Sequence, residues 1–218
     1  MHPTIALLLV VTGGYLLGSV SFAVLISRAL GLADPRSYGS GNPGATNVQR
    51  SGSKIAALLT LLGDAGKGAL AAWLVLRYGP VWGLDEDAAA LTGLAAFAGH
   101  LYPLYHHFKG GKGVATFLGV VWVLSPWLGL AVCVVWLLVA ASFRYSSAAS
   151  LASAVVAPFG QLFFAGMDVT FLALAAMAVL LVMRHRQNIA KLRAGTERKI
   201  GQKSAPPGSA ATARRGSR

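Results

Sequence analysis

The sequence predicts an all-α integral membrane protein with seven transmembrane helices, some of them short. Of its 218 residues, 55% are hydrophobic and 12% are charged, whereas a typical soluble domain has about 25% charged residues. The apolar residues form long runs, and a helix needs about 20 of them to cross a ~30 Å hydrocarbon core. We therefore expect one transmembrane domain over residues 1–201, followed by a disordered basic tail at 202–218, which is rich in Pro, Ala, Ser and Arg.

Six apolar runs accommodate the seven helices. The runs are Thr4–Ser27, Ile55–Tyr78, Ala88–Leu104, Val114–Phe143, Leu151–Ala165 and Thr170–Met183. The first is expected to form one helix. The run Val114–Phe143 is too long for one ordinary span, so we expect two short helices that turn at Ser125–Pro126. Pro103 is expected to break or kink the helix that contains it, because proline removes a helical hydrogen bond and clashes with the preceding turn.

The distribution of charge predicts the orientation of the chain. All but Lys67 and Arg77 of the 19 lysines and arginines fall on one predicted side of the membrane, whereas residues 79–87 form an acidic turn on the other. Basic loops favour the cytoplasmic side, so we expect an outside N-terminus and a cytoplasmic C-terminus. Neither Lys nor Arg precedes the first apolar run, and we therefore do not expect a cleavable signal peptide.

The polar segment Tyr38–Lys54 combines glycines with hydrogen-bond donors and cations. Gly39, Gly41 and Gly44 allow the backbone to bring N–H groups close to a ligand, and Arg50 adds a fixed positive charge. A phosphate group requires this combination. Glycine-rich loops also occur at membrane surfaces without a ligand, and a second basic loop favours the binding interpretation. The neutral donors of the first loop are Ser40, Asn42, Thr46 and Asn47.

The second basic loop is Lys109-Gly110-Gly111-Lys112-Gly113. We expect it to lead into a helix N-terminus, where free N–H groups attract anions. It does not match the Walker A pattern G-x-x-x-x-G-K-[ST]. His106 and His107 precede it, but adjacent helical positions point apart and no Cys, Asp or Glu lies nearby, so we expect no metal site.

A third polar segment, Arg184–Lys199, directly follows the last apolar run. His185 and Asn188 would share one face if the segment is helical. With Arg144–Ser150, the three segments predict a cytoplasmic site for several anionic groups, without a Ser-His-Asp set, a carboxylate pair or an H-x-x-x-x-D signature. Nucleic acid is not an expected partner, because the aromatic residues lie in apolar runs, away from the basic residues.

Asp64 and Lys67 lie inside the second apolar run, three residues apart and therefore on one helical face. Ionisable groups at that depth are costly and often mark a functional site. A mutual ion pair that fixes the packing of helices explains them equally well.

Three blocks of residues stand out: Gly39–Val48 with Arg50, Gly99-His100 with Phe108–Thr116, and His185–Ile189 with Leu192, Gly195 and Glu197. Together they resemble the signature blocks of the bacterial acyl-phosphate:glycerol-3-phosphate acyltransferases. The resemblance extends over residues 4–201 and implies a seven-span enzyme of the bacterial plasma (inner) membrane, with its active site on the cytoplasmic face. Such enzymes need no cofactor and acylate the sn-1 hydroxyl of glycerol 3-phosphate with acyl phosphate, releasing lysophosphatidic acid and inorganic phosphate.

The resemblance also implies roles for individual residues. Ser147 or Ser150 would add a hydrogen-bond donor, and Glu197 would orient a basic partner. The residues expected to hold the phosphate of glycerol 3-phosphate and to support catalysis are Ser40, Arg50, Lys109, His185 and Asn188. The residues expected to bind the head of acyl phosphate are Asn42, Thr46, Asn47, Gly110, Gly111, Lys112 and Gly113. Gly39, Gly41 and Gly44 are also expected to bind substrate.

Acyl phosphate is an activated donor, so positioning and charge neutralisation can supply most of the rate. Two groups are candidates for the base: the phosphate dianion of glycerol 3-phosphate and His185. The implied partners are membrane lipid and the enzyme that makes acyl phosphate. A transporter for a phosphorylated solute is the alternative, but its polar groups should lie at mid-membrane between repeated halves, and no repeat is apparent in the sequence.

Overall fold

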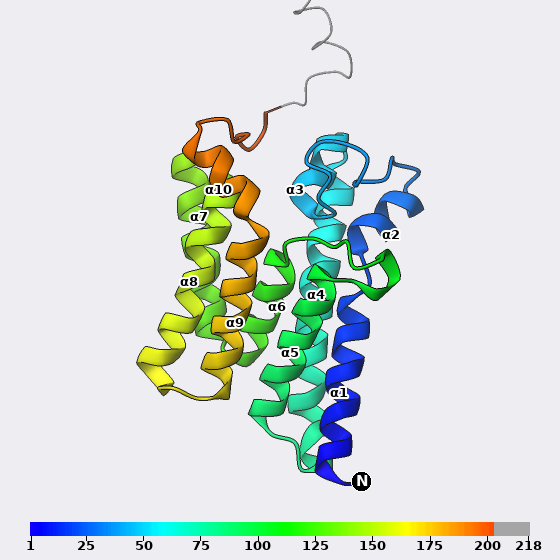
Figure 1. Ribbon diagram of the computed structural model, residues 1–218, viewed down its shortest axis with the longest axis vertical. Coiled ribbons are helices and arrows are strands. Elements are labelled where there is room, and N and C mark those ends of the chain that lie inside the picture. The colour runs from blue at the N-terminus through cyan, green and yellow to red at the C-terminus, as the bar shows by residue number, and fades with distance from the viewer. Residues whose placement is uncertain (203–218) are drawn as a thin grey trace, which may run out of the picture.

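A computed structural model describes residues 1–202 of the protein (Figure 1). The predicted disordered tail therefore lies outside the described residues, apart from Gln202. Within the described range the chain is helical and contains no strand, which confirms the predicted all-α class. The helices are α1 (Pro3–Gly18), α2 (Phe22–Ala29), α3 (Ala45–Val48), α4 (Lys54–Tyr78), α5 (Glu86–Leu101), α6 (Val114–Leu124), α7 (Pro126–Phe143), α8 (Ser146–Ala165), α9 (Val169–Arg184) and α10 (Arg186–Arg193).

The long helices run roughly along one axis of the molecule (Figure 1). Within the described part of the chain, three helices are long and apolar enough to cross a membrane: α4 with the turn after it, α7 and α8. The count rises to five if the bent pairs α1–α2 and α9–α10 each form one span, and α6 is a shorter apolar helix. As predicted, the chain turns at Ser125–Pro126, and α5 ends just before Pro103.

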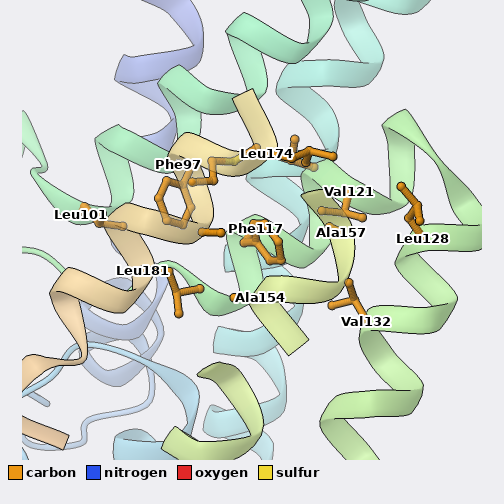
Figure 2. Packing of buried hydrophobic residues seen from close by; sticks show 13 residues of the cluster. Phe97, Leu101, Phe117, Val121, Leu128, Val132, Ala154, Ala157, Leu174 and Leu181 are labelled. Carbon is orange, nitrogen blue, oxygen red and sulfur yellow. The ribbon is translucent and has the colours of Figure 1, made fainter. Parts of the chain in front are cut away.

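One hydrophobic cluster joins α5 through α9 (Figure 2). Phe97 of α5 and Phe117 of α6 meet edge to face at its centre, with ring centroids 6.4 Å apart. A glycine allows α6 to approach α4 closely, because a Cβ atom on Gly119 would overlap the carbonyl of Ala65. The cluster therefore fixes α6, and with it the loop that precedes α6. Other buried members are Leu101, Val120, Val121, Leu128, Val132, Ala154, Ala157, Leu174, Met177, Ala178 and Leu181.

The prediction of one continuous helix over Thr4–Ser27 is wrong. The run is interrupted between α1 and α2, whose axes differ by 44°. Lys67 Nζ donates to the carbonyl of Val20 at 2.6 Å, and Ser19 Oγ accepts a hydrogen bond from the N–H of Leu104 at 3.2 Å. A helix can break inside an apolar segment when other parts of the protein satisfy the freed backbone groups. Here the partners lie far away in the sequence.

Asp64 and Lys67 form an ion pair with 2.9 Å between Lys67 Nζ and Asp64 Oδ1, and their side chains are 3% and 1% exposed. His100 Nδ1 lies 3.5 Å from the same carboxylate oxygen and 3.2 Å from the hydroxyl of Thr116. The pair therefore has a structural role: it connects α4 to the break after α1 and to α5.

Replacing Lys67 with methionine is expected to lower the free energy of unfolding by about 3–5 kcal/mol, because the buried Asp64 loses its counter-charge. The double variant Asp64→Leu/Lys67→Met removes both charges and should recover much of that loss. Thermal unfolding in detergent measures both variants. A single variant as stable as the unmodified protein would contradict the structural role.

Candidate active site

The first loop is organised around the side chain of Asn47, which is 2% exposed. Its Nδ2 donates to the carbonyls of Pro35 at 2.7 Å and Tyr38 at 3.2 Å. Its Oδ1 accepts from the N–H of Ser40 at 2.9 Å and from Arg50 Nη1 at 3.2 Å. Asn47 thus fixes the loop and directs the guanidinium of Arg50.

The glycine before Ser40 is required by this arrangement. Gly39 has a φ of 63°, and a Cβ atom there would overlap Asn47 Oδ1. Ser40 and Thr46 are exposed, whereas Asn42 and Gly44 are half-buried. The hydroxyl of Thr46 lies 3.3 Å from that of Ser146, so the first loop reaches the beginning of α8.

A chain of hydrogen bonds joins the second loop to the third polar segment. Lys112 Nζ donates to Asn188 Oδ1 at 2.5 Å, and Asn188 Nδ2 donates to Glu197 Oε1 at 2.6 Å. Ser147 Oγ donates to the same carboxylate oxygen at 2.7 Å. Four side chains from the loop before α6, from α8, from α10 and from the segment after α10 thus form one polar network.

The charges show that the first loop faces this network. Burial lowers the pKa of Lys112 to about 8, with Glu197 opposing the shift and Arg50 adding to it. Burial also lowers the pKa of Arg50, Arg198 acts in the same direction, and Glu197 opposes it. Arg50, Lys112 and Glu197 therefore lie within electrostatic range of one another. Two cations accompany one carboxylate, which suits an anionic ligand.

His185 lies just beyond the last residue of α9 and is 2% exposed. Its Nδ1 is 2.8 Å from the carbonyl of Leu181. A carbonyl only accepts, so Nδ1 carries the proton and Nε2 is the free nitrogen. Burial lowers the pKa of His185 to about 4, and Lys112 adds to the shift. The imidazole is therefore neutral at neutral pH.

Lys109 occupies a different part of the site. It is exposed and lines a small cavity together with Gly110, Gly111, Lys67 and His100. In the part of the chain that the structure describes, no hydrogen bond or ion pair connects Lys109 to the other four residues expected to hold glycerol 3-phosphate. The structure thus joins Ser40 with Arg50, places Asn188 beside Lys112, and leaves Lys109 at a separate cavity.

Two serines of α8 differ in their surroundings. Ser147 contacts the carboxylate of Glu197, as described above. Ser150 Oγ donates to the carbonyl of Ser146 at 2.8 Å and accepts from Trp136 Nε1 at 3.2 Å. Of the two candidates for an additional donor, Ser147 therefore reaches the polar network and Ser150 faces α7.

Arg184 belongs to the site, although no sequence motif predicted it. Its Nε donates to the carbonyl of Gly111 at 3.1 Å and its Nη2 to that of Gly110 at 2.8 Å. The second loop also leads into a helix, as predicted, with Gly113 as the N-cap of α6 at a φ of 81°. A signal for Arg184 was its place next to His185, but its carbonyl partners are more than 70 residues away.

Phosphate affinity is expected to depend on the protonation of Lys112. Its pKa is about 8 in the folded protein instead of 10.5, so the ammonium is present below pH 8 and is lost as the pH rises through that value. We expect the association constant for inorganic phosphate to fall by up to about tenfold per pH unit above pH 8. Calorimetric titration at pH 7–10 measures this dependence. Lys112→Arg should flatten the pH dependence of phosphate affinity. Identical pH profiles for both proteins would contradict a role of Lys112 in phosphate binding.

The fold and the site define a multi-pass helical membrane protein whose polar loops bring cations and hydrogen-bond donors together. The model of the glycerol-3-phosphate acyltransferase family matches residues 8–195. The chain belongs to this family.

Individual relatives are similar over nearly their whole length. The glycerol-3-phosphate acyltransferase of Ralstonia pickettii (strain 12J) is 58% identical over 203 residues, which are 93% of this chain and 98% of that protein. The one from Ralstonia nicotianae is 57% identical over 94% of this chain and 100% of that protein. Crystal structures of PlsY (YgiH), an integral membrane glycerol 3-phosphate acyltransferase, superpose with TM-scores of 0.83 for the glycerol 3-phosphate form and 0.82 for the lysophosphatidic acid form. Both are 37% identical to this chain and cover 90% of it and 96% of their own chain.

Proposed function

We propose that this protein transfers a fatty acyl group from acyl phosphate to the sn-1 hydroxyl of glycerol 3-phosphate, giving lysophosphatidic acid and inorganic phosphate. The observation that supports it best is the network of Lys112, Asn188, Glu197 and Ser147 beside Arg50. It supplies cations and donors for phosphate groups. The solved structures of PlsY with the acceptor and the acylated product support the same reaction class.

The donor follows from the chemistry of the site. Acyl phosphate is a mixed anhydride with a good leaving group, so it needs neutralisation of the departing phosphate more than a protein nucleophile. Lys112 and the backbone of Gly110–Gly113 lie at the beginning of α6, where N–H groups point outward from a helix N-terminus. We assign the head of acyl phosphate to this loop, with Asn42 and Thr46 from the first loop.

The acceptor is assigned to the cations around the network. In this proposal, Ser40, Arg50, His185 and Asn188 hold the phosphate of glycerol 3-phosphate, and Lys109 joins them from its separate cavity. Asn47 is buried and bound to both Ser40 and Arg50, and it therefore acts through them.

In the reaction, the sn-1 oxygen bonds to the acyl carbon, and the bond from that carbon to the phosphate oxygen breaks, so that inorganic phosphate leaves. The hydroxyl proton passes to the phosphate dianion of glycerol 3-phosphate, whose second pKa is about 6. His185 is the weaker candidate for the base, because its pKa is about 4. A group with that pKa accepts a proton from a hydroxyl less readily than the phosphate does.

The membrane arrangement is part of the proposal. The seven spans are α1 with α2, and then α4, α5, α6, α7, α8 and α9. The N-terminus lies outside, and the C-terminus and the active site face the cytoplasm at the bacterial inner membrane, because the basic loops gather at one end of the bundle. The proposed protein partner is an enzyme that makes acyl phosphate. The product, lysophosphatidic acid, enters the lipid bilayer.

The choice of donor is tested with the purified protein in detergent. Acyl phosphate and acyl-CoA of the same chain length are each supplied with glycerol 3-phosphate, and lysophosphatidic acid is quantified. We expect product from acyl phosphate and at most about 1% of that rate from acyl-CoA, since the thioester places no phosphate at the reacting carbon. Equal or faster acylation from acyl-CoA would reject the proposed donor.

A further inference from the structure

The side chain of Arg184 holds the second loop from the end of α9. The guanidinium donates to two consecutive carbonyls, those of Gly110 and Gly111. It also lies over the ring of Tyr102, with 5.4 Å between its Cζ and the ring centroid. One planar group therefore makes three contacts with the segment that leads from α5 to α6.

His100 holds the other side of the same loop. The N–H of Gly111 donates to the carbonyl of His100 at 3.1 Å. A Cβ atom on Gly111 would overlap the imidazole of His100, and one on Gly110 would overlap its carbonyl. His100 is in turn held by Asp64 and Thr116. The two glycines thus fit between a fixed histidine and the arginine.

This arrangement leaves the next two backbone N–H groups of the loop available for a ligand. With the carbonyls of Gly110 and Gly111 turned toward Arg184, the N–H groups of Lys112 and Gly113 donate to no backbone carbonyl among residues 1–202. The Lys112 side chain extends to Asn188, four residues after Arg184. Arg184 thus fixes the direction of the loop backbone, and the same end of α9 and α10 holds the side chain of Lys112 through Asn188.

We propose that Arg184 is a positioning residue: by holding the carbonyls of Gly110 and Gly111, it sets the direction of the N–H groups and the lysine that bind acyl phosphate. This inference rests on the proposed function, because it concerns the donor subsite of that reaction. Arg184 acts through the loop and does not contact the substrate itself.

Arginine suits this role better than lysine. Its rigid planar fork presents several N–H donors and stacks on an aromatic ring, whereas lysine offers a single ammonium on a flexible chain. Lysine at this position would keep the charge and lose the simultaneous contacts with two carbonyls and the ring. The geometry of the loop would therefore relax although the local charge stays the same.

The test uses Arg184→Lys and Arg184→Gln in the full-length protein in detergent. We measure kcat and the KM of each substrate, together with the melting temperature. Both variants are expected to lose roughly 10²-fold in kcat/KM for acyl phosphate, because a displacement of about 1 Å at a reacting group has an effect of that size. The KM of glycerol 3-phosphate should rise less than that of acyl phosphate, because Ser40 and Arg50 are held by Asn47 on the first loop.

Arg186→Lys and Arg186→Gln serve as matched controls, since Arg186 is exposed two residues further along the chain. They should retain nearly full activity. Full activity of Arg184→Lys would overturn the positioning role, because it would show that charge alone suffices. Equal weakening of both substrates would overturn it too. If the unmodified protein does not turn over acyl phosphate, the proposed function fails; if it does and Arg184→Lys matches it, only this inference fails.

Discussion

Replacing Arg50 with alanine is expected to lower kcat/KM for glycerol 3-phosphate by about 10²–10³-fold, which is the usual effect of removing one donor from a charge-stabilising site. The guanidinium is held by Asn47 and lies within electrostatic range of Glu197 and Arg198. It is therefore pre-positioned to receive a phosphate. The rate of lysophosphatidic acid formation, measured over a range of acceptor concentrations, gives the effect.

Arg50→Lys and Lys54→Ala complete this experiment. Arg50→Lys keeps the charge but loses the fork that binds phosphate oxygens in pairs, so a substantial loss of activity should remain. Lys54 belongs to the same loop region but is exposed at the beginning of α4, and its removal should change kcat/KM by less than about threefold, as is usual for a solvent-screened charge. Equal losses for Arg50→Ala and Lys54→Ala would show that only the net charge of the loop matters.

Replacing Glu197 with alanine is expected to reduce activity by at least about 10²-fold and to lower the melting temperature. Its carboxylate accepts hydrogen bonds from both Asn188 and Ser147, and the loss leaves two donors without a partner. An unpaired polar group costs about 1–3 kcal/mol when it is buried, as Ser147 is. The negative charge that favours the ammonium form of Lys112 is lost as well. Activity assays and thermal unfolding measure the two effects.

Glu197→Gln separates the two causes. Glutamine retains a carbonyl oxygen that can accept from Asn188 or Ser147, but it carries no charge. The variant should therefore recover much of the stability and less of the activity. Thr196→Ala, at an exposed neighbouring position, is the control. If Glu197→Gln is as unstable as Glu197→Ala, the hydrogen bonds do not have the assigned role.

The fold class could be predicted because composition and apolar runs determine it. Proline and glycine also correctly marked the C-terminal end of α5 and the beginnings of α6 and α7. The break between α1 and α2 was not predicted: Gly18, Ser19 and Ser21 lie at it, but glycine and serine are also common within continuous transmembrane helices. Its stabilising partner, Lys67, follows 47 residues later. The same long-range contact explains the ion pair in α4, whose role stayed open in the sequence.

The polar segments of the site could be found from their glycines and cations, but the contacts within them could not. Asn47 carries the same amide as Asn42, yet it is buried as the organiser of its loop. Ser147 and Ser150 are close in sequence and face different partners. Arg184 contacts carbonyls of Gly110 and Gly111. Every residue has a backbone carbonyl, so the sequence does not show which ones serve as acceptors.

The proposed reaction transfers the acyl group from phosphate to an acceptor hydroxyl. Its most direct test is to quantify inorganic phosphate and lysophosphatidic acid in the same reaction, with and without glycerol 3-phosphate. We predict that the two products appear in equal amounts and that both require the acceptor. Phosphate release without the acceptor would indicate hydrolysis, and binding of glycerol 3-phosphate without either product would indicate a binding or transport protein. Each result would contradict the proposed acyl transfer.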